Sequence, residues 1–336
     1  MNDNLFKYII LSILIFNILL TFKKFKSNLD KTNQHEIKSK LIAKNEDKYK
    51  ELFNLYFKDK KKFYSKGRKY ISQQLGKIYN ESNVITFQDK LNYLLIHESP
   101  EDKTNIVDKI QLRNYSKTIL GKDICTPILK IYNDIDEINL DELPEKFVLK
   151  CNHGSGMNIF CEDKSKFNIS KVKKKLKEWM NINYGLLRFE YQYLNVNRQV
   201  FAEKLLDKEI INYKFSCFNG EPKLIRVKGN FNGTNLYRIY YINWTISNIE
   251  FDDEKYVLTN MFKKPKNFDK MIKYSKLLSS RFCYCRVDFY EVNGNLYLGE
   301  ITFTPFNTII KFKKKETEIY LGNLINISRI KTNKNP

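Results

Sequence analysis

The sequence is short of arginine, histidine and paired cysteines. Only 9 of its 59 basic residues are Arg, the residue that makes two-pronged contacts with bases and phosphates. No nucleic-acid-binding motif accompanies the basic charge, so we expect no nucleic-acid partner. The six cysteines include no C-x-x-C pair, and the 3 histidines complete no zinc-ligand spacing. The thiols are therefore expected to be reduced, as in a cytosolic core.

The sequence also has no internal repeat and no low-complexity tract, but it carries a large excess of positive charge. Its formal net charge is +21. Residues 23–82 hold 17 Lys or Arg and 7 Asp or Glu, so nearly half of the excess lies in one segment. An excess of this size normally indicates an anionic partner, such as a phosphorylated ligand or a lipid surface.

One long apolar run, LFKYIILSILIFNILLTF, lies at residues 5–22. Eighteen helical residues span about 27 Å, which is just enough for a bilayer core. Lysines follow the run (KKFK), and no small-residue cleavage site is visible. The positive-inside rule then places the rest of the chain in the cytoplasm. We predict a single-pass transmembrane anchor at residues 1–26 and a basic helical stalk at 27–84 against an anionic membrane surface.

The remaining chain, residues 85–330, is predicted to be one α+β domain. Residues 85–120 read as two helices split near Pro100, and amphipathic patterns predict helices at 169–182 and 268–280. Hairpin-forming strands, rather than a run of βαβ units, favour antiparallel sheets. The predicted strands are 147–151, 157–161, 199–205, 213–218, 223–228, 237–242, 284–292 and 295–303.

A glycine-bearing loop in KFVLKCNHGSGMNIF, residues 146–160, joins two of these strands. Gly154 and Gly156 allow the backbone to approach a ligand closely, and successive exposed N–H groups at such a tip bind anions. Lys150 ends the first strand and adds a point charge suited to phosphate. The alternative is an ordinary flexible hairpin loop.

Two carboxylates, Asp288 and Glu300, lie on strands joined at Asn293-Gly294, a strong hairpin signal. Paired carboxylates on neighbouring strands can hold Mg²⁺ together with the phosphates of a nucleotide. A strict two-residue turn with regular pairing would put them on opposite faces. The magnesium hypothesis therefore requires an odd loop or a β-bulge. Without one, the two side chains have separate structural roles.

A third segment, QVFAEKLLDKEIINYKFSCFNGEP at residues 199–222, places Glu203 and Lys204 at the end of one strand and Lys214 on the next. A carboxylate and a lysine so placed would bracket a nucleoside and its phosphates. Arg238 is a further candidate for contact with an acidic sugar, although a solvated or ion-paired strand arginine is the simpler interpretation.

The order of these motifs resembles the ATP-grasp fold, and within it the teichuronopeptide-biosynthesis (TupA-like) family of cell-envelope polysaccharide clusters. The resemblance covers residues 85–326. It is carried by TFQDKLNYL, LPEKFVLKCNHGSG, AEKLL, NYKFSCFNGEPKLI, RVDFYEVNGNLYLGEITFTP and LGNLI.

The resemblance implies antiparallel sheets that sandwich ATP, with Mg²⁺ as cofactor. It also implies an ATP-dependent carboxylate–amine ligase that works through an acyl phosphate, in cell-envelope or capsular polysaccharide synthesis. The carboxylate and amine substrates would be sugar acids or amino acids. The implied ATP-binding residues are Lys150, His153, Gly154, Ser155, Gly156, Glu203, Lys204 and Lys214. The implied catalytic residues are Arg286 and Lys214, and the implied metal ligands are Asp288 and Glu300.

The sequence departs from the family pattern at two places. Asn212-Tyr213-Lys214 replaces D-Y-K, and Phe306, Asn307 and Thr308 stand where glycines usually follow TFTP. These departures leave a degenerate, non-catalytic nucleotide-binding member as an alternative. A glycosyltransferase-like enzyme of the same pathway is the other; it would use a D-x-D metal motif, and Asp134-Ile135-Asp136 reads instead as a solvated loop.

Overall fold

The structure is a computed structural model that describes residues 54–74, 76, 79–207, 210–231, 234–252 and 262–330. Contacts between residues divide the chain into two compact units, residues 1–78 and 79–336. In the first unit, helix α3 (Lys60–Gln74) follows a shorter helical stretch. Phe63 of α3 is fully buried, and its ring lies 5.5 Å from that of Tyr56.

The structure contradicts the predicted membrane localisation. In the described part of the chain, no helix is long and apolar enough to cross a membrane. The run at residues 5–22 and the first half of the predicted stalk lie outside the described residues. The predicted contact with an anionic membrane surface depended on those same residues.

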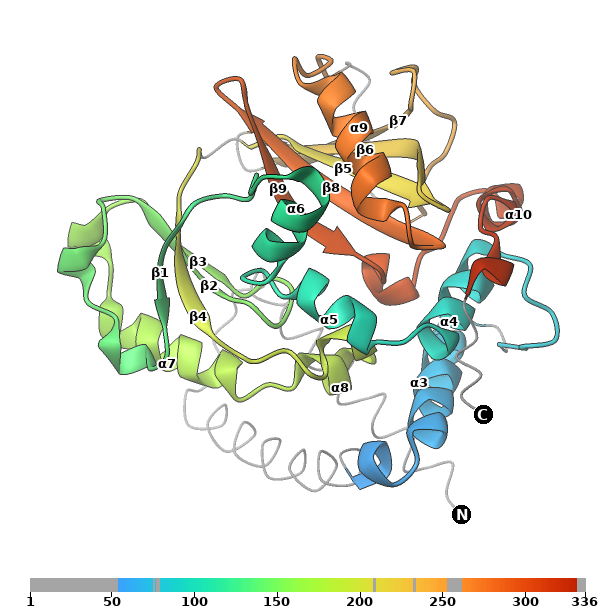
Figure 1. The fold of residues 1–336 in the computed structure, drawn as a ribbon, viewed down its shortest axis with the longest axis horizontal. Helices are drawn as coiled ribbons and strands as arrows, with labels where there is room; N and C mark the ends of the chain where they lie inside the picture. The colour runs from blue at the N-terminus through green and yellow to red at the C-terminus, as the bar shows by residue number, and fades with distance from the viewer. Residues whose placement is uncertain are drawn as a thin grey trace, which may run out of the picture. The chain divides into compact units, whose positions relative to one another are not determined.

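The second unit contains two antiparallel sheets. The smaller sheet has four strands in the order β1-β4-β2-β3 (Figure 1). Helix α7 (Ile169–Met180) packs beneath this sheet. The Asn168 side chain caps α7 by accepting from the N–H of Lys171, and Leu176 is buried with the sheet's apolar side chains. The strands are β1 (Ile128–Tyr132), β2 (Phe147–Cys151), β3 (Asn158–Cys161) and β4 (Val200–Lys204).

The larger sheet has five strands in the order β7-β6-β5-β8-β9, and helix α9 (Phe268–Ser279) covers one of its faces (Figure 1). Met271 of α9 packs with Phe215 and Val287, and all three side chains are fully buried. The opposite face carries the charged residues described below. The strands are β5 (Asn212–Phe218), β6 (Glu221–Phe231), β7 (Thr234–Tyr241), β8 (Tyr284–Val292) and β9 (Asn295–Thr302).

Three helices, not the predicted two, occupy residues 85–120. Pro100 separates the first two as expected. The additional break is at Asp108, whose side chain accepts from the N–H of Ile110 and closes a turn. The helices are α4 (Phe87–His97), α5 (Glu101–Val107) and α6 (Leu112–Leu120). The other α-helices of this unit are α8 (Tyr184–Arg188) and α10 (Lys315–Asn323).

All eight predicted strands and both amphipathic helices are confirmed, and so is the α+β class with antiparallel sheets. β1 was not predicted, because its sequence ILKIY does not alternate apolar and polar residues; two of its apolar side chains, Leu129 and Ile131, are exposed. Short 3₁₀ helices connect the elements. They are η2 (Ile135–Glu137), η3 (Leu140–Glu142), η4 (Lys164–Lys166), η5 (Tyr191–Tyr193), η6 (Pro305–Thr308) and η7 (Ile327–Arg329).

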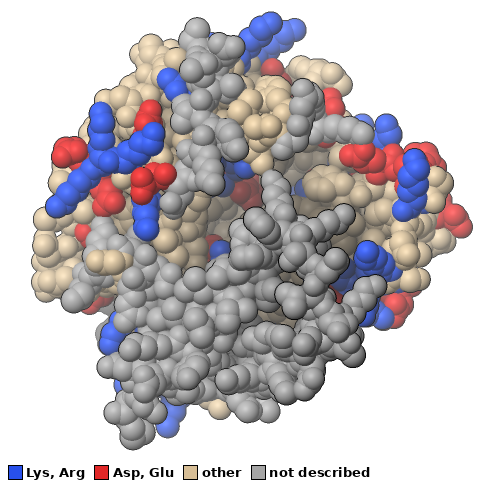
Figure 2. All heavy atoms as spheres, turned by 180° about the vertical axis from the view of Figure 1, so that it is seen from behind, with Lys and Arg blue, Asp and Glu red and all other residues tan. Residues whose placement is uncertain are grey.

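Charges of both signs are intermingled on the described surface. On the face in Figure 2, basic and acidic side chains lie next to one another in several places. Surface ion pairs include Lys177 with Asp136 at 2.6 Å. The other carboxylate of the D-x-D motif, Asp134, caps η2 by accepting from the N–H of Asp136. The motif is thus engaged in local structure, which agrees with its interpretation as a solvated loop.

Candidate active site

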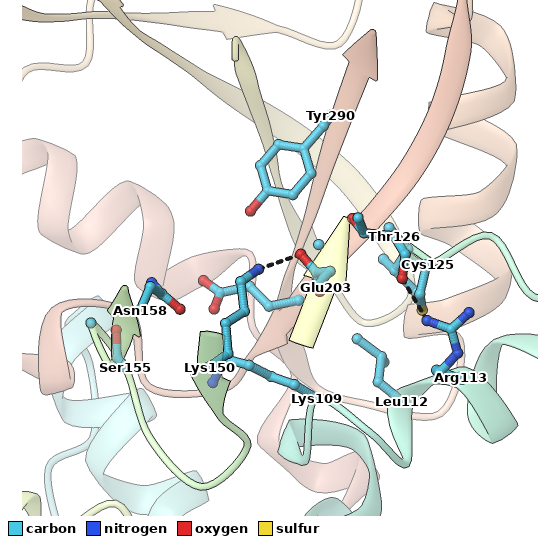
Figure 3. A pocket seen from close by; sticks show the side chains of 14 residues that line it. Lys109, Leu112, Arg113, Cys125, Thr126, Lys150, Ser155, Asn158, Glu203 and Tyr290 are labelled. Carbon is cyan, nitrogen blue, oxygen red and sulfur yellow. Dashed lines mark hydrogen bonds and ion pairs between the residues drawn. The ribbon is translucent and has the colours of Figure 1, made fainter. Parts of the chain in front are cut away.

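A lysine–glutamate pair joins two strands of the smaller sheet. Lys150 on β2 lies with its Nζ 2.5 Å from Oε1 of Glu203 on β4, and both side chains are mostly buried (Figure 3). The strands pair so that Val148 lies opposite Glu203, two residue pairs from Lys150, and the even spacing puts Lys150 and Glu203 on the same face. Two of the predicted nucleotide-binding residues are therefore in contact, and each holds the other in place at the sheet surface.

The glycine loop between β2 and β3 is anchored at its start and open at its tip. The Asn152 amide donates to the carbonyl of Asn197, and its Oδ1 accepts from the N–H of Gln199. Gly156 has φ +76°, a left-handed conformation that favours glycine. Gly154 lies against the Tyr184 ring, where a Cβ atom would be only 2.8 Å from a ring carbon. Both glycines are thus required for the observed loop conformation.

Asp288 and Glu300 lie directly opposite each other on β8 and β9. The hairpin has the two-residue turn that would separate them, with Val292 paired to Asn295. The register shifts between Asp288 and Phe289, and Gly299 is the extra residue that brings both carboxylates to one face. The condition set by the magnesium hypothesis is therefore met by a bulge within β9, not at the turn.

Two cations hold Asp288. Arg286 Nε and Nη2 lie 2.6 and 2.7 Å from the two oxygens of Asp288, and Lys214 on the neighbouring strand also pairs with it. Arg286 Nη2 reaches Glu300 at 3.0 Å. Burial alone would raise the pKa of Asp288, but Arg286 and Lys214 outweigh that effect and hold its pKa at about 2. The carboxyl group is therefore ionised at neutral pH.

The donor set fits Mg²⁺ only in part. Two ionised carboxylates on one face are typical of Mg²⁺ sites that also use substrate phosphates. Within the described residues, no cluster of three or more His, Cys, Asp or Glu side chains provides a complete metal site. A metal at Asp288 and Glu300 would therefore take its remaining ligands from phosphate and water, and it would compete with Lys214 for Asp288.

One pocket brings the two sheets' functional side chains together (Figure 3). Lys150 and Glu203 line it from the smaller sheet, and Glu300 lines it from the larger. Ser155 and Gly156 of the loop are at its edge, so the loop covers the space where these charges meet. The pocket thus unites five of the residues that the sequence singled out.

Four predicted ATP-binding residues do not line this pocket: His153, Gly154, Lys204 and Lys214. His153 is buried, and its Nε2 lies 3.2 Å from the carbonyl oxygen of Trp179 at the end of α7. Burial lowers the pKa of His153 to about 4, so the ring is neutral at pH 7. Lys204 is exposed, because it alternates with Glu203 along β4. His153 therefore has a structural contact with the end of α7.

The lining also includes residues that sequence reasoning did not single out, among them Lys109 and Tyr290. Lys109 follows the turn after α5, donates to the Gly154 carbonyl and lies near Glu300 and Lys150. Tyr290 presents its hydroxyl toward the Lys150–Glu203 pair (Figure 3). Burial raises the pKa of Tyr290, and nearby carboxylates add to the rise, so the phenol remains a hydrogen-bond donor. The Asp-Lys pair after a short helix was the only available sequence signal for Lys109.

A buried acid, Glu190, lies in a hydrogen-bond network next to the site. Glu190 accepts a hydrogen bond from the Thr304 hydroxyl, and the Tyr184 hydroxyl lies 3.3 Å from its other oxygen. Burial raises the pKa of Glu190, and Glu300 adds to the rise. Since Tyr184 also covers Gly154, this network connects the glycine loop with the end of β9.

Comparisons with known proteins agree with this architecture. A family model described as TupA-like ATPgrasp matches residues 89–326. No curated protein matches the chain.

Several solved structures are similar at low identity. A D-alanine–D-alanine ligase from Bacillus anthracis, complexed with ATP, is 18% identical with a TM-score of 0.40; the match covers 66% of this chain and 64% of that one. An L-amino acid ligase from Bacillus licheniformis is 12% identical with a TM-score of 0.36, and the match covers 60% of this chain and 41% of that one. An N5-carboxyaminoimidazole synthase from Aspergillus clavatus, in complex with ADP, is 12% identical with a TM-score of 0.37, and the match covers 62% of this chain and 46% of that one. This chain thus spans less than two thirds of each of these proteins.

Proposed function

The chain belongs to the TupA-like ATP-grasp family, and on that basis we propose that it is an ATP-dependent carboxylate–amine ligase. The observation that carries the proposal is the convergence of Lys150, Glu203 and Glu300 in one pocket under a glycine loop. The pathway is cell-envelope or capsular polysaccharide synthesis, as the family implies, and the substrates are acids and amines such as sugar acids or amino acids.

In the proposed reaction, a carboxylate oxygen of the substrate attacks the γ-phosphorus of ATP. A C–O–P bond forms, the bond to the β–γ bridging oxygen breaks, and ADP leaves. An amine then attacks the acyl carbon, phosphate departs, and the amine loses a proton. Mg²⁺, when bound, neutralises charge on the phosphates.

Each side chain of the site has a defined part in this scheme. Lys150 and Lys109 supply positive charge at the phosphates, and the loop N–H groups near Ser155 and Gly156 add hydrogen bonds. Glu203, at the end of β4, accepts from the nucleoside. Asp288 and Glu300 would hold the metal, and Arg286 beside them stabilises the negative charge that develops during phosphoryl transfer.

The loop also has a protective function in the proposal. Acyl phosphates are hydrolysed by water, so a ligase must cover the intermediate until the amine arrives. The loop is anchored by Asn152, while Gly156 at its tip faces the pocket. This arrangement allows the tip to close over ATP without moving the strands.

A second candidate is a nucleotide-binding member without turnover. The engagement of both Asp288 oxygens by Arg286 and Lys214 favours it, because a metal must displace at least one of these contacts. The glycosyltransferase-like alternative has no comparable support, since the D-x-D carboxylates cap η2 and pair with Lys177.

The test is ATP-dependent trapping of an acyl phosphate by the full-length protein. Hydroxylamine converts acyl phosphates to hydroxamates, so a panel of sugar acids and amino acids is assayed for hydroxamate and ADP. Hydroxamate that requires ATP, and that Glu300→Gln abolishes, supports the ligase. Mg²⁺-ATP binding by calorimetry without ADP release for any acid supports the second candidate. Absence of both binding and release would remove the nucleotide-based function.

A further inference from the structure

Glu190 has no part in the proposed reaction, yet its carboxyl group is buried beside the candidate active site. The residue lies between α8 and η5 and is only 6% exposed. Its hydrogen-bond donors are the hydroxyl groups of Thr304 and Tyr184 and, at 3.5 Å, the amide of Gln192. Burial of a carboxyl group costs folding free energy. The contacts of Glu190 are therefore expected to contribute more than stability.

One oxygen of Glu190 holds the residue that covers the glycine loop. The Tyr184 hydroxyl lies 3.3 Å from Oε1 of Glu190. The Tyr184 ring lies so close to Gly154 that a Cβ atom there would be 2.8 Å from a ring carbon. Gly154 directly precedes the two loop residues that line the pocket. The position of the Tyr184 ring therefore limits where the tip of the loop can lie.

The other oxygen of Glu190 holds the end of the strand that carries Glu300. Thr304 lies two residues beyond β9, and its hydroxyl donates to Oε2 of Glu190. The Thr304 oxygen also accepts from the Gln192 amide at 2.8 Å, which leaves the hydroxyl hydrogen for Glu190. Within β9, the Thr302 hydroxyl lies 3.2 Å from Glu300. Glu190 is thus attached to the segment that positions one of the proposed metal ligands.

Glu190 lies where the apolar cores of the two sheets meet. The Tyr184 ring packs against the core of the smaller sheet, and the Tyr193 ring packs against that of the larger sheet. The centroids of these two rings are 5.1 Å apart, in an edge-to-face arrangement. The smaller sheet carries the glycine loop, and the larger sheet carries Glu300. The hydrogen bonds of Glu190 therefore join the same two parts of the site.

We propose that Glu190 is a positioning residue that fixes the glycine loop relative to Glu300. Its carboxyl group holds the Tyr184 hydroxyl with one oxygen and the Thr304 hydroxyl with the other. The N–H groups of the loop are thereby kept in one position over the pocket. The catalytic consequence rests on the proposed function: a loop held in place keeps water away from the acyl phosphate. The fixing of the loop itself does not depend on that function.

Three substitutions separate hydrogen bonding from charge and from volume. Glu190→Gln removes the charge and keeps both contacts, since the amide oxygen can accept from Thr304 and the amide nitrogen can donate to the Tyr184 oxygen. Glu190→Leu fills a similar space and makes neither contact. Tyr184→Phe keeps the ring against Gly154 and removes only the hydroxyl. Positioning predicts that Glu190→Gln resembles the wild type, whereas Glu190→Leu and Tyr184→Phe share one defect.

Hydrogen exchange of the full-length protein without ligands tests the positioning. Glu190→Leu and Tyr184→Phe should each speed the exchange of the backbone amides of residues 153–157 at least tenfold, and Glu190→Gln should speed it less than threefold. Tyr132→Phe is the matched control. It removes another buried hydroxyl from the smaller sheet, one without a hydrogen-bond partner among the described residues, and should leave exchange in the loop unchanged.

Three results of the exchange experiment would overturn the proposal. The first is unchanged exchange of the loop in Glu190→Leu. The second is equal acceleration in β8, which would show a general loss of stability rather than release of the loop. The third is a defect in Glu190→Gln as large as that in Glu190→Leu, which would assign the effect to the charge.

The balance of ADP and hydroxamate tests the catalytic consequence. In the hydroxylamine assay, a loop held in place gives one hydroxamate for each ADP, whereas water that reaches the acyl phosphate gives ADP alone. Glu190→Leu and Tyr184→Phe should raise the ratio of ADP to hydroxamate at least threefold, and Glu190→Gln should leave it unchanged. A merely structural defect would lower both products equally, so an unchanged ratio in Glu190→Leu would contradict the role of Glu190.

The two measurements separate this proposal from the proposed function. If the wild type releases no ADP with any acid but Glu190→Leu frees the loop in hydrogen exchange, the ligase function fails and the positioning stands. If the wild type forms hydroxamate but exchange in the loop does not depend on Glu190, the positioning fails and the ligase function stands.

Discussion

Asp288 and Glu300 face each other across β8 and β9 because Gly299 is an extra residue in β9. With regular pairing from the two-residue turn, the partner of Asp288 would be Gly299, and Glu300 would point to the other face. Gly299 also leaves room for Tyr290, since a Cβ atom there would lie 2.6 Å from the Tyr290 ring. One glycine thus sets the carboxylate geometry and the position of Tyr290, which lines the same pocket as Lys150 and Glu203.

The first prediction concerns this bulge. Gly299→Ala should force the Tyr290 ring to move, lower the unfolding free energy by about 1–3 kcal/mol and reduce ATP turnover at least tenfold. Urea denaturation and ADP release measure the two effects. Tyr290→Ala in the same chain should remove the clash, so the double variant should be more stable than the sum of the single changes indicates. Strictly additive effects would show that the two residues do not interact in this way.

The second prediction concerns the proposed metal ligands, Asp288 and Glu300. Glu300→Gln keeps the size of the side chain and removes its charge, so Mg²⁺-dependent turnover should fall about 10²–10³-fold. The contact of Arg286 with Asp288 should remain, because Glu300 is not part of it. Calorimetric titration of Mg²⁺ in the presence of ATP should show a matching loss of metal affinity. Normal metal affinity in the variant would exclude Glu300 as a ligand.

The third prediction concerns nucleotide affinity. Lys150→Met removes a cation from the pocket and leaves the mostly buried Glu203 without this partner. The KM for ATP should rise about 10–100-fold, since one charge-assisted hydrogen bond contributes about 1.5–3 kcal/mol. Lys146→Met, at an exposed position just before β2, is the matched control and should leave the KM unchanged. A similar rise in both variants would point to general loss of positive charge rather than a specific contact.

The fourth prediction concerns the stability at low pH. His153 is neutral and buried in the folded protein with a pKa of about 4, whereas an unfolded histidine has a pKa near 6.5. Unfolding therefore takes up a proton between these values, and the unfolding free energy should fall as the pH drops from about 6.5 to 4. The loss is roughly 3 kcal/mol. His153→Gln should flatten this part of the curve in urea denaturation across the pH range, and an unchanged slope would contradict the assignment.

The sequence by itself determined the elements with strong local patterns. The stripe of apolar residues in α7 and the alternation in β8 each depend on neighbours a few positions away, so they could be read before the structure. The order of motifs also identified the family, and the match of the family model to residues 89–326 confirms it. The membrane prediction also came from a local pattern. It is wrong, since no helix in the described part of the chain is long and apolar enough to cross a membrane.

Only the tertiary structure decided which charged residues meet. Lys150 pairs with Glu203, which is 53 positions away in the sequence, and Lys109, between α5 and α6, donates to the glycine loop. Such contacts depend on tertiary packing, which no local sequence pattern records. Gly299 lies against the Tyr290 ring, a close approach between the backbone of β9 and a side chain of β8 that no local pattern shows. Arg226, Lys214 and Asp288, distant in the sequence, become neighbours because strands β6, β5 and β8 pair in one register.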